Sequence, residues 1–334
     1  MAPVNLEPIV QMLKPFLVSL TVTLLLGPAV IPLLTRLKFG QNIRDDGPRR
    51  HLRKSGTPTM GGVMFLAGIT AAGLWFAGNS WDGLLVLGMT LAFGLIGFLD
   101  DFIKVALKRP LGLRAREKLL GQVLFSLAAA AFCVSVLGRG TDLVVPYSGF
   151  FTPGGFTWEL GAAGFFVFAV LVIAGTANAV NLTDGLDGLA AGTSALTAAA
   201  LLAVAFTVDK TGVAAVLAAV SGGCLGFLFY NRHPARVFMG DTGSLALGSA
   251  LGTAALVIRS ELFLFLIGGV FVLETLSVIL QVASFQLFGR RILRMSPLHH
   301  HFELCNWSEN RVVVTFWAAT VVFAALGLVG FYGL

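Results

Sequence analysis

The stretch Asn178-Ala-Val-Asn-Leu-Thr-Asp-Gly-Leu-Asp-Gly188 separates two long apolar runs, and the organisation of the chain follows from it. It carries four polar side chains with no Lys or Arg among them, those of Asn178, Asn181, Asp184 and Asp187. Acids at the edge of a hydrocarbon layer are costly unless they have a partner or a task. Gly185 and Gly188 let the backbone turn, so that the two carboxylates can converge. A simple polar turn between helices explains the glycines but leaves the regular spacing of the four side chains unexplained.

The composition around this stretch is that of an integral membrane protein. The chain has 334 residues, of which 56% are hydrophobic and only 12% charged, against about 25% charged in soluble domains. A spanning helix needs about 20 apolar residues. We therefore predict an all-α integral membrane protein of one domain over residues 1–334, with about ten transmembrane helices near 13–35, 60–78, 83–103, 119–137, 159–177, 190–208, 212–230, 244–258, 262–285 and 312–332.

The basic residues are sorted by loop, which predicts the orientation in the membrane. Alternate loops hold 19 of the 23 Lys and Arg, within residues 36–54, 104–118, 232–236 and 290–311. Cytoplasmic loops carry the excess of Lys and Arg, so these loops and the 178–188 stretch should face the cytoplasm, with both termini outside. The net charge of +6 therefore indicates no nucleic-acid partner. Residues 138–158 should form a short hairpin on the outer surface.

The first two cytoplasmic loops contribute basic and acidic candidates for a site. Lys54 and Thr59 lie in a glycine- and proline-rich segment that holds them beside the membrane face, although most charges there serve equally well as a topology anchor. The third span ends in Asp100 and Asp101, and Lys104 follows within helical reach of both. A helix-end ion pair is the plain alternative. Lys118 lies in the basic segment beyond.

The loop from Asn231 to Ser244 places Asp241 between two glycines, Gly240 and Gly243, which let its backbone approach a ligand closely. A helix cap and turn would also account for this pattern. Phe238, beside polar residues, is suited either to stacking on a planar base or to anchoring the loop at the membrane interface.

The ninth span should bend or break, because Gly268, Gly269, Glu274 and Gln281 interrupt its apolar background. It leads to His299, His300 and His301 in a basic segment. Consecutive residues cannot easily bind one zinc ion together, so histidines that donate to a phosphate fit this segment better.

Taken together, acids from three loops with basic side chains around them suit Mg²⁺ or Mn²⁺ bridging phosphate oxygens. Phosphoryl transfer depends mainly on positioning and charge neutralisation, so such a site needs little else. Its place at the cytoplasmic membrane surface implies that a water-soluble phosphate compound meets a lipid one.

Five motifs in this order resemble the phospho-N-acetylmuramoyl-pentapeptide transferases, a family of the polyprenyl-phosphate N-acetylhexosamine-1-phosphate transferase superfamily. They are Gly-Thr-Pro-Thr-Met-Gly-Gly (56–62), Asp-Asp-Phe-Ile-Lys (100–104), the 178–188 stretch, Phe-Met-Gly-Asp-Thr-Gly-Ser (238–244) and Pro-Leu-His-His-His-Phe-Glu (297–303). The triple-His motif is the part that points to the muramoyl-pentapeptide family.

The resemblance implies a homodimer in the bacterial inner membrane that transfers phospho-MurNAc-pentapeptide from UDP-MurNAc-pentapeptide to undecaprenyl phosphate, giving lipid I and UMP. It implies Asp241 as the Mg²⁺ ligand and Phe238 as the ring that stacks on uracil. It implies Asp100 and Asp101 as the pair that deprotonates or orients the lipid phosphate, and Lys104, Lys118 and His299 as further catalytic residues. The nucleotide or diphosphate contacts it implies are Lys54, Thr59, Asn178, Asn181, Asp184, Asp187, Asn231, His300 and His301.

Two other functions remain open from the sequence. A transporter of a phosphorylated metabolite would have charged residues near the bilayer midplane. Here Glu274 is the one acid expected there, and the other acids lie at helix ends on one side. A sibling transferase for UDP-GlcNAc would keep the acids but not the triple-His motif. Direct attack by the lipid phosphate and a covalent aspartyl intermediate would use the same residues.

Overall fold

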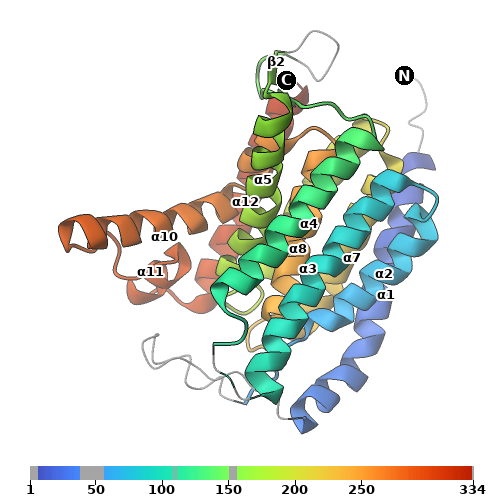
Figure 1. Cartoon of the computed structure of the whole chain (residues 1–334). Helices are drawn as coiled ribbons and strands as arrows, with labels where there is room; N and C mark the ends of the chain where they lie inside the picture. The colour runs from blue at the N-terminus through green and yellow to red at the C-terminus, as the bar shows by residue number, and fades with distance from the viewer. Residues whose placement is uncertain (1–6, 38–55, 108, 110, 150–155, 333–334) are drawn as a thin grey trace, which may run out of the picture.

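The computed structural model describes residues 7–37, 56–107, 109, 111–149 and 156–332. Within these residues the chain forms twelve helices and two short strands. Eight of the helices are long and apolar enough to cross a membrane. The protein is therefore an all-α, multi-pass membrane protein, as the apolar runs predicted (Figure 1).

Each predicted span corresponds to a helix or, for the ninth, to two. The helices are α1 (Glu7–Arg36), α2 (Gly62–Ala77), α3 (Trp81–Ala106), α4 (Ala115–Ser135), α5 (Gly161–Thr183), α6 (Leu189–Thr207), α7 (Thr211–Asn231), α8 (Gly240–Val257), α9 (Glu261–Ile267), α10 (Gly269–Phe288), α11 (Leu298–Leu304) and α12 (Glu309–Tyr332).

The predicted surface hairpin is present between α4 and α5. Strand β1 (Asp142–Val144) pairs antiparallel with β2 (Thr157–Glu159), and Leu143 lies opposite Trp158. The Tyr147 hydroxyl donates to the carbonyl oxygen of Leu326 at 2.6 Å, which ties the hairpin to the last turns of α12. The hairpin and the end of α12 thus share one end of the bundle (Figure 1).

Helix α8 forms the centre of the bundle, because its residues from Thr242 to Val257 are buried on every face. It packs between α3 and α5, and small residues set the spacing. Gly248, for example, lies against the backbone of Ala177 in α5. Small residues at such crossings let two backbones approach closely, which is how helices associate in lipid.

The ninth span is broken as predicted. Gly268 ends α9 and Gly269 begins α10, which leaves the bundle sideways with α11 beside it (Figure 1). The projecting end of α10 exposes apolar side chains, with Leu287 73% and Phe288 74% exposed. This exposure suits a helix surrounded by lipid rather than by water.

Candidate active site

The close approach of α3 and α8 brings three carboxylates together. Gly97 in α3 lies against the backbone oxygen of Asp241, and a Cβ on Gly97 would collide with it. One turn later α3 presents Asp100 and Asp101 to the start of α8. One carboxylate oxygen from each of Asp100, Asp101 and Asp241 lies within 4.8 Å of the other two.

Asp241 sits in the first turn of α8 rather than in the preceding loop, where the sequence analysis placed it. The reason is Gly240, whose φ of +73° turns the backbone into the helix earlier than the polar sequence suggested. A Cβ on Gly240 would lie 2.5 Å from Asp101 Oδ2 and 2.9 Å from Thr59 Oγ1. Glycine therefore keeps the space beside the carboxylates open.

Two lysines neutralise this cluster. Asp241 Oδ2 accepts hydrogen bonds from Lys118 Nζ at 2.7 Å and from Lys104 Nζ at 3.1 Å. Lys104 Nζ also lies 2.6 Å from Asp100 Oδ2, and Lys118 Nζ lies 3.9 Å from the same oxygen. The predicted trio of Asp100, Asp101 and Lys104 is thus not a closed helix-end pair, because both lysines also bind Asp241.

Asp100 and Asp101 are held separately, as adjacent positions on a helix require. Asp100 Oδ1 accepts from the backbone N–H of Leu113 at 2.7 Å. Asp101 Oδ2 accepts from both the backbone N–H and the hydroxyl of Thr242, at 2.9 and 2.8 Å. Both carboxylates are nearly buried, so these bonds fix their directions.

The donor set fits a hard divalent cation. Three carboxylates offer one oxygen each within a small space, and oxygen ligands are what Mg²⁺ and Mn²⁺ prefer. The ammonium groups of Lys104 and Lys118 both contact Oδ2 of Asp241. A cation and the lysines would therefore share the neutralisation of a bound phosphate.

The 178–188 stretch reaches this cluster through Asn181. Its side-chain amide donates to Asp241 Oδ1 and to Ser244 Oγ, both at 2.8 Å. Asn178 lies further into α5, where it donates to Gln122 Oε1 of α4 at 2.7 Å. Asp184 follows the end of α5, and its burial and the nearby carboxylates of Asp241, Asp101 and Asp187 raise its pKa well above the ordinary value.

Asp187 belongs to a second cluster. His233 Nδ1 lies 3.0 Å from Asp187 Oδ2 and 3.2 Å from Glu309 Oε2. The N–H of Ala235 donates to Asp187 Oδ2 at 3.0 Å, and the N–H of Asp187 donates to Glu309 Oε1 at 2.8 Å. The sequence led us to expect that the carboxylates of Asp184 and Asp187 converge. In the structure the Asp187 carboxylate instead contacts His233 and the N–H of Ala235, in the loop before α8.

Asn231 has a bridging position beside this cluster. Its Oδ1 accepts from the N–H of Gly188 at 2.9 Å, and its Nδ2 donates to the carbonyl oxygen of Val237 at 2.9 Å. The side chain is buried, so it joins the 178–188 turn to the loop before α8. An amide side chain suits this position, because it accepts from one backbone group and donates to another.

The first motif lies against the loop before α8. The N–H of Phe238 donates to the carbonyl oxygen of Pro58 at 2.8 Å, and that of Gly61 to the carbonyl oxygen of Phe238 at 2.8 Å. Thr59 is buried between them and faces Gly240, whereas the ring of Phe238 is half-buried. Lys54 lies outside the described residues.

The three histidines have different surroundings on the short helix α11, which the sequence analysis treated as a loop. His299 is fully buried, with Nδ1 3.1 Å from Glu274 Oε1. His300 Nδ1 lies 2.8 Å from Glu303 Oε2, and the N–H of Arg294 donates to His301 Nδ1 at 3.2 Å. The His299 ring packs against Gly185, so α11 borders the 178–188 turn.

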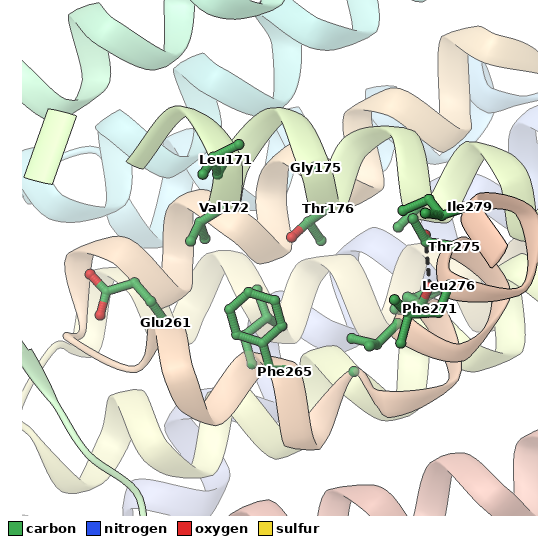
Figure 2. A pocket seen from close by; sticks show the side chains of 14 residues that line it. Leu171, Val172, Gly175, Thr176, Glu261, Phe265, Phe271, Thr275, Leu276 and Ile279 are labelled. Carbon is green, nitrogen blue, oxygen red and sulfur yellow. Dashed lines mark hydrogen bonds between the residues drawn. The ribbon is translucent and has the colours of Figure 1, made fainter. Parts of the chain in front are cut away.

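An apolar cavity of about 250 Å³ opens between α5 and the broken ninth span (Figure 2). Glu261 and Leu171 line it toward the hairpin end, and Ala179, next to Asn178, lines it toward the carboxylate cluster. Phe265, Thr275 and Ile279 of α9 and α10 form the opposite wall (Figure 2). The cavity therefore runs along the membrane-facing side of α5.

Several residues of these networks were not singled out from the sequence as site residues. Gln122, His233 and Glu309 belong to no recognisable motif. Their partners lie at least 46 positions away in the chain, so no local pattern indicated them. Glu274 was noted as a cause of bending and as a charge near the bilayer midplane, but not as a site residue. Its position inside an apolar helix was the available signal, because an acid there needs a partner.

Known proteins are similar to this chain along most of its length. Residues 83–259 match the model of glycosyl transferase family 4, and residues 54–66 match the phospho-N-acetylmuramoyl-pentapeptide-transferase signature 1. A phospho-N-acetylmuramoyl-pentapeptide-transferase of Pelotomaculum thermopropionicum is 66% identical over 319 residues, covering 96% of this chain and 98% of the relative. That of Desulforudis audaxviator is 61% identical over 324 residues, covering 95% and 97%. With the carboxylate cluster, the His segment and relatives at this identity along nearly its whole length, the chain belongs to the phospho-N-acetylmuramoyl-pentapeptide-transferase family.

Proposed function

We propose that this protein transfers phospho-MurNAc-pentapeptide from UDP-MurNAc-pentapeptide to undecaprenyl phosphate, forming lipid I and releasing UMP. The observation that carries the proposal is the set of three carboxylates and two lysines at the meeting point of α3, α4 and α8. A site of this kind neutralises phosphate oxygens from several directions and positions two reactants for phosphoryl transfer.

The sugar nucleotide would bind on the face formed by the 178–188 turn, the loop before α8 and α11. Asn181 and Asp184 border the carboxylate cluster on this side, and the half-buried Phe238 ring is available to stack on uracil. His300, His301, Thr59 and Lys54 complete the predicted contacts. The side-chain amide of Asn181 fixes the direction of the Asp241 carboxylate, so this carboxylate need not reorient during the reaction.

The acceptor would approach from the membrane. Its phosphate would lie beside Asp100 and Asp101, with its isoprenoid chain in the apolar cavity that begins near Asn178. An oxygen of that phosphate forms a new bond to the sugar-linked phosphorus, while the bond from this phosphorus to the oxygen of UMP breaks. Lys104 and Lys118 neutralise the charge that develops on the phosphate oxygens.

Mg²⁺, or Mn²⁺ in its place, would be held by Asp241 together with the neighbouring carboxylates of Asp100 and Asp101. It would supply additional positive charge to the diphosphate. We also propose that the protein is a homodimer in the bacterial inner membrane. The carboxylate cluster would face the cytoplasm and both termini the outside, in agreement with the distribution of basic residues.

Mass spectrometry of the product tests the proposal. The purified protein is incubated with undecaprenyl phosphate and either UDP-MurNAc-pentapeptide or UDP-GlcNAc. Formation of lipid I and UMP from the first nucleotide only is the expected result. Transfer of GlcNAc-1-phosphate at a comparable rate would instead indicate the sibling transferase activity.

A further inference from the structure

Glu274 is a buried acid that the proposed transfer reaction does not use. It lies inside the apolar helix α10, and its side chain has no exposed surface. An acid in such a place requires a partner. The partners it has belong to the His segment at the start of α11.

Both carboxylate oxygens of Glu274 are engaged by this segment. Oε2 accepts from the N–H of Leu298 at 2.8 Å, and Oε1 accepts from the N–H of His299 at 3.2 Å. Oε1 also lies 3.1 Å from His299 Nδ1. Because the carboxylate accepts from two backbone donors, its bond to the ring is best satisfied by a proton on Nδ1. The other ring nitrogen, Nε2, then carries the free lone pair.

Among the residues that the structure describes, none offers His299 Nε2 a hydrogen-bond partner, although this atom is buried. It lies against Gly185, and a Cβ on Gly185 would collide with it. Gly185 follows Asp184 in the turn that borders the carboxylate cluster. A buried polar atom without a partner is rare in proteins and calls for an explanation, such as a role in the chemistry of a neighbouring site.

We propose that Glu274 is a positioning residue, which fixes the tautomer and direction of His299 so that Nε2 is presented over Gly185 to the sugar nucleotide. In this tautomer Nε2 is an acceptor, so it suits an N–H or O–H of the nucleotide rather than a phosphate oxygen. A carboxylate that orients a catalytic imidazole in this way has the same role in hydrolase triads. The inference rests on the proposed function.

A separate set of hydrogen bonds anchors the chain that precedes α11, at Ile292 and Leu293, to α10. Gln281 Oε1 accepts from the N–H groups of Ile292 and Leu293, at 3.0 and 2.9 Å, and its Nε2 donates to the carbonyl oxygen of Leu293 at 2.9 Å. Loss of the Glu274 charge should therefore leave the segment attached. The effect on His299 can then be measured apart from detachment.

A double-mutant cycle in the full-length protein tests the inference. Glu274→Gln should lower kcat/KM for the nucleotide by about 10- to 100-fold, as is typical when the partner that orients a functional His is lost. In the His299→Ala background the same change should alter kcat/KM by less than about twofold, since residues that act through one another are not additive. Leu280→Ala, at an exposed site on the same helix, is the control and should retain the wild-type rate.

Nitrogen-15 histidine NMR supplies a readout that does not require activity. The His299 signal, assigned by its loss in His299→Ala, should show the proton on Nδ1 in the wild type and a mixture of tautomers in Glu274→Gln. If Glu274→Gln does not fold, Gly185→Ala displaces the ring from the opposite side and should also lower kcat/KM. An equal loss on Glu274→Gln with and without His299, or an Nε2 proton in the neutral wild-type ring, would overturn the inference. Failure of the transfer reaction itself would appear in the wild-type assay and leave the NMR result intact.

Discussion

Gly97 of α3 lies directly against the backbone carbonyl oxygen of Asp241 in α8, with no room for a Cβ between them. This contact sets how closely the last turns of α3 approach the first turn of α8. The carboxylates of Asp100 and Asp101 meet that of Asp241 because of it. A residue without a side chain thus determines the geometry of a site built from charged ones.

The first prediction concerns this crossing. Gly97→Ala should push α3 away from α8 and lower kcat/KM by about a hundredfold, as a shift of about 1 Å in reacting groups does. Gly88→Ala on the same helix is the matched control, because a Cβ there meets no described residue within 4 Å. It should leave the transfer rate unchanged and raise the thermal stability slightly, since Ala favours helix over Gly. Equal rates for the two variants would contradict the packing argument.

The second prediction addresses the roles of Asp100 and Asp101. A phosphate monoester has its second pKa near 6, so the lipid phosphate is mostly dianionic at neutral pH and gains little from a base. Asp100→Asn and Asp101→Asn should therefore keep measurable activity that partly recovers between about pH 7 and pH 9.

The same account predicts no UMP release from the nucleotide when lipid phosphate is absent. A covalent aspartyl nucleophile would behave differently, because no other group replaces it at any pH. A stoichiometric burst of UMP without lipid, lost in either variant, would establish the covalent route instead.

The third prediction concerns orientation in the membrane. Cysteines introduced singly into a variant without Cys133, Cys224 and Cys305 should report the side of each loop. Arg291→Cys should react with an impermeant thiol reagent only from the cytoplasm, and Ser148→Cys only from outside. Both positions are exposed, so access to the thiol is not limiting. Reversed labelling would place the carboxylate cluster on the wrong side for a cytoplasmic nucleotide.

The fourth prediction concerns Asn231. Asn231→Ala should lower the free energy of unfolding by about 1–3 kcal/mol, because it leaves the N–H of Gly188 and the carbonyl of Val237 buried without partners. Asn79→Ala, at an exposed turn, is the matched control and should change stability little. Thermal unfolding in detergent compares the two variants. A wild-type melting temperature for Asn231→Ala, with a raised KM for the nucleotide, would show a substrate contact instead of a bridge.

The sequence predicted the spans, a bend or break in the ninth span and the hairpin before α5, because apolar length and helix-breaking glycines act locally. It also identified Asp100, Asp101, Lys104, Lys118, Asn181 and Asp241, which the structure brings together. The roles of Asp187 and Asn231 depend on His233, Glu309 and backbone groups of other loops. Such pairings arise only when the helices have packed, so no local pattern indicated them.

We propose that Asp241, with its neighbouring carboxylates, holds the divalent cation on which transfer depends. The most direct measurement is the rate of lipid I formation as a function of Mg²⁺ concentration, in the wild type, in Asp241→Asn and in the control Asp82→Asn, whose carboxylate pairs with Lys210 elsewhere in the fold. We expect no transfer in EDTA, wild-type behaviour for Asp82→Asn, and a rate at least about a hundredfold lower for Asp241→Asn at every Mg²⁺ concentration. Full activity in EDTA, or a near-normal rate for Asp241→Asn, would contradict the account.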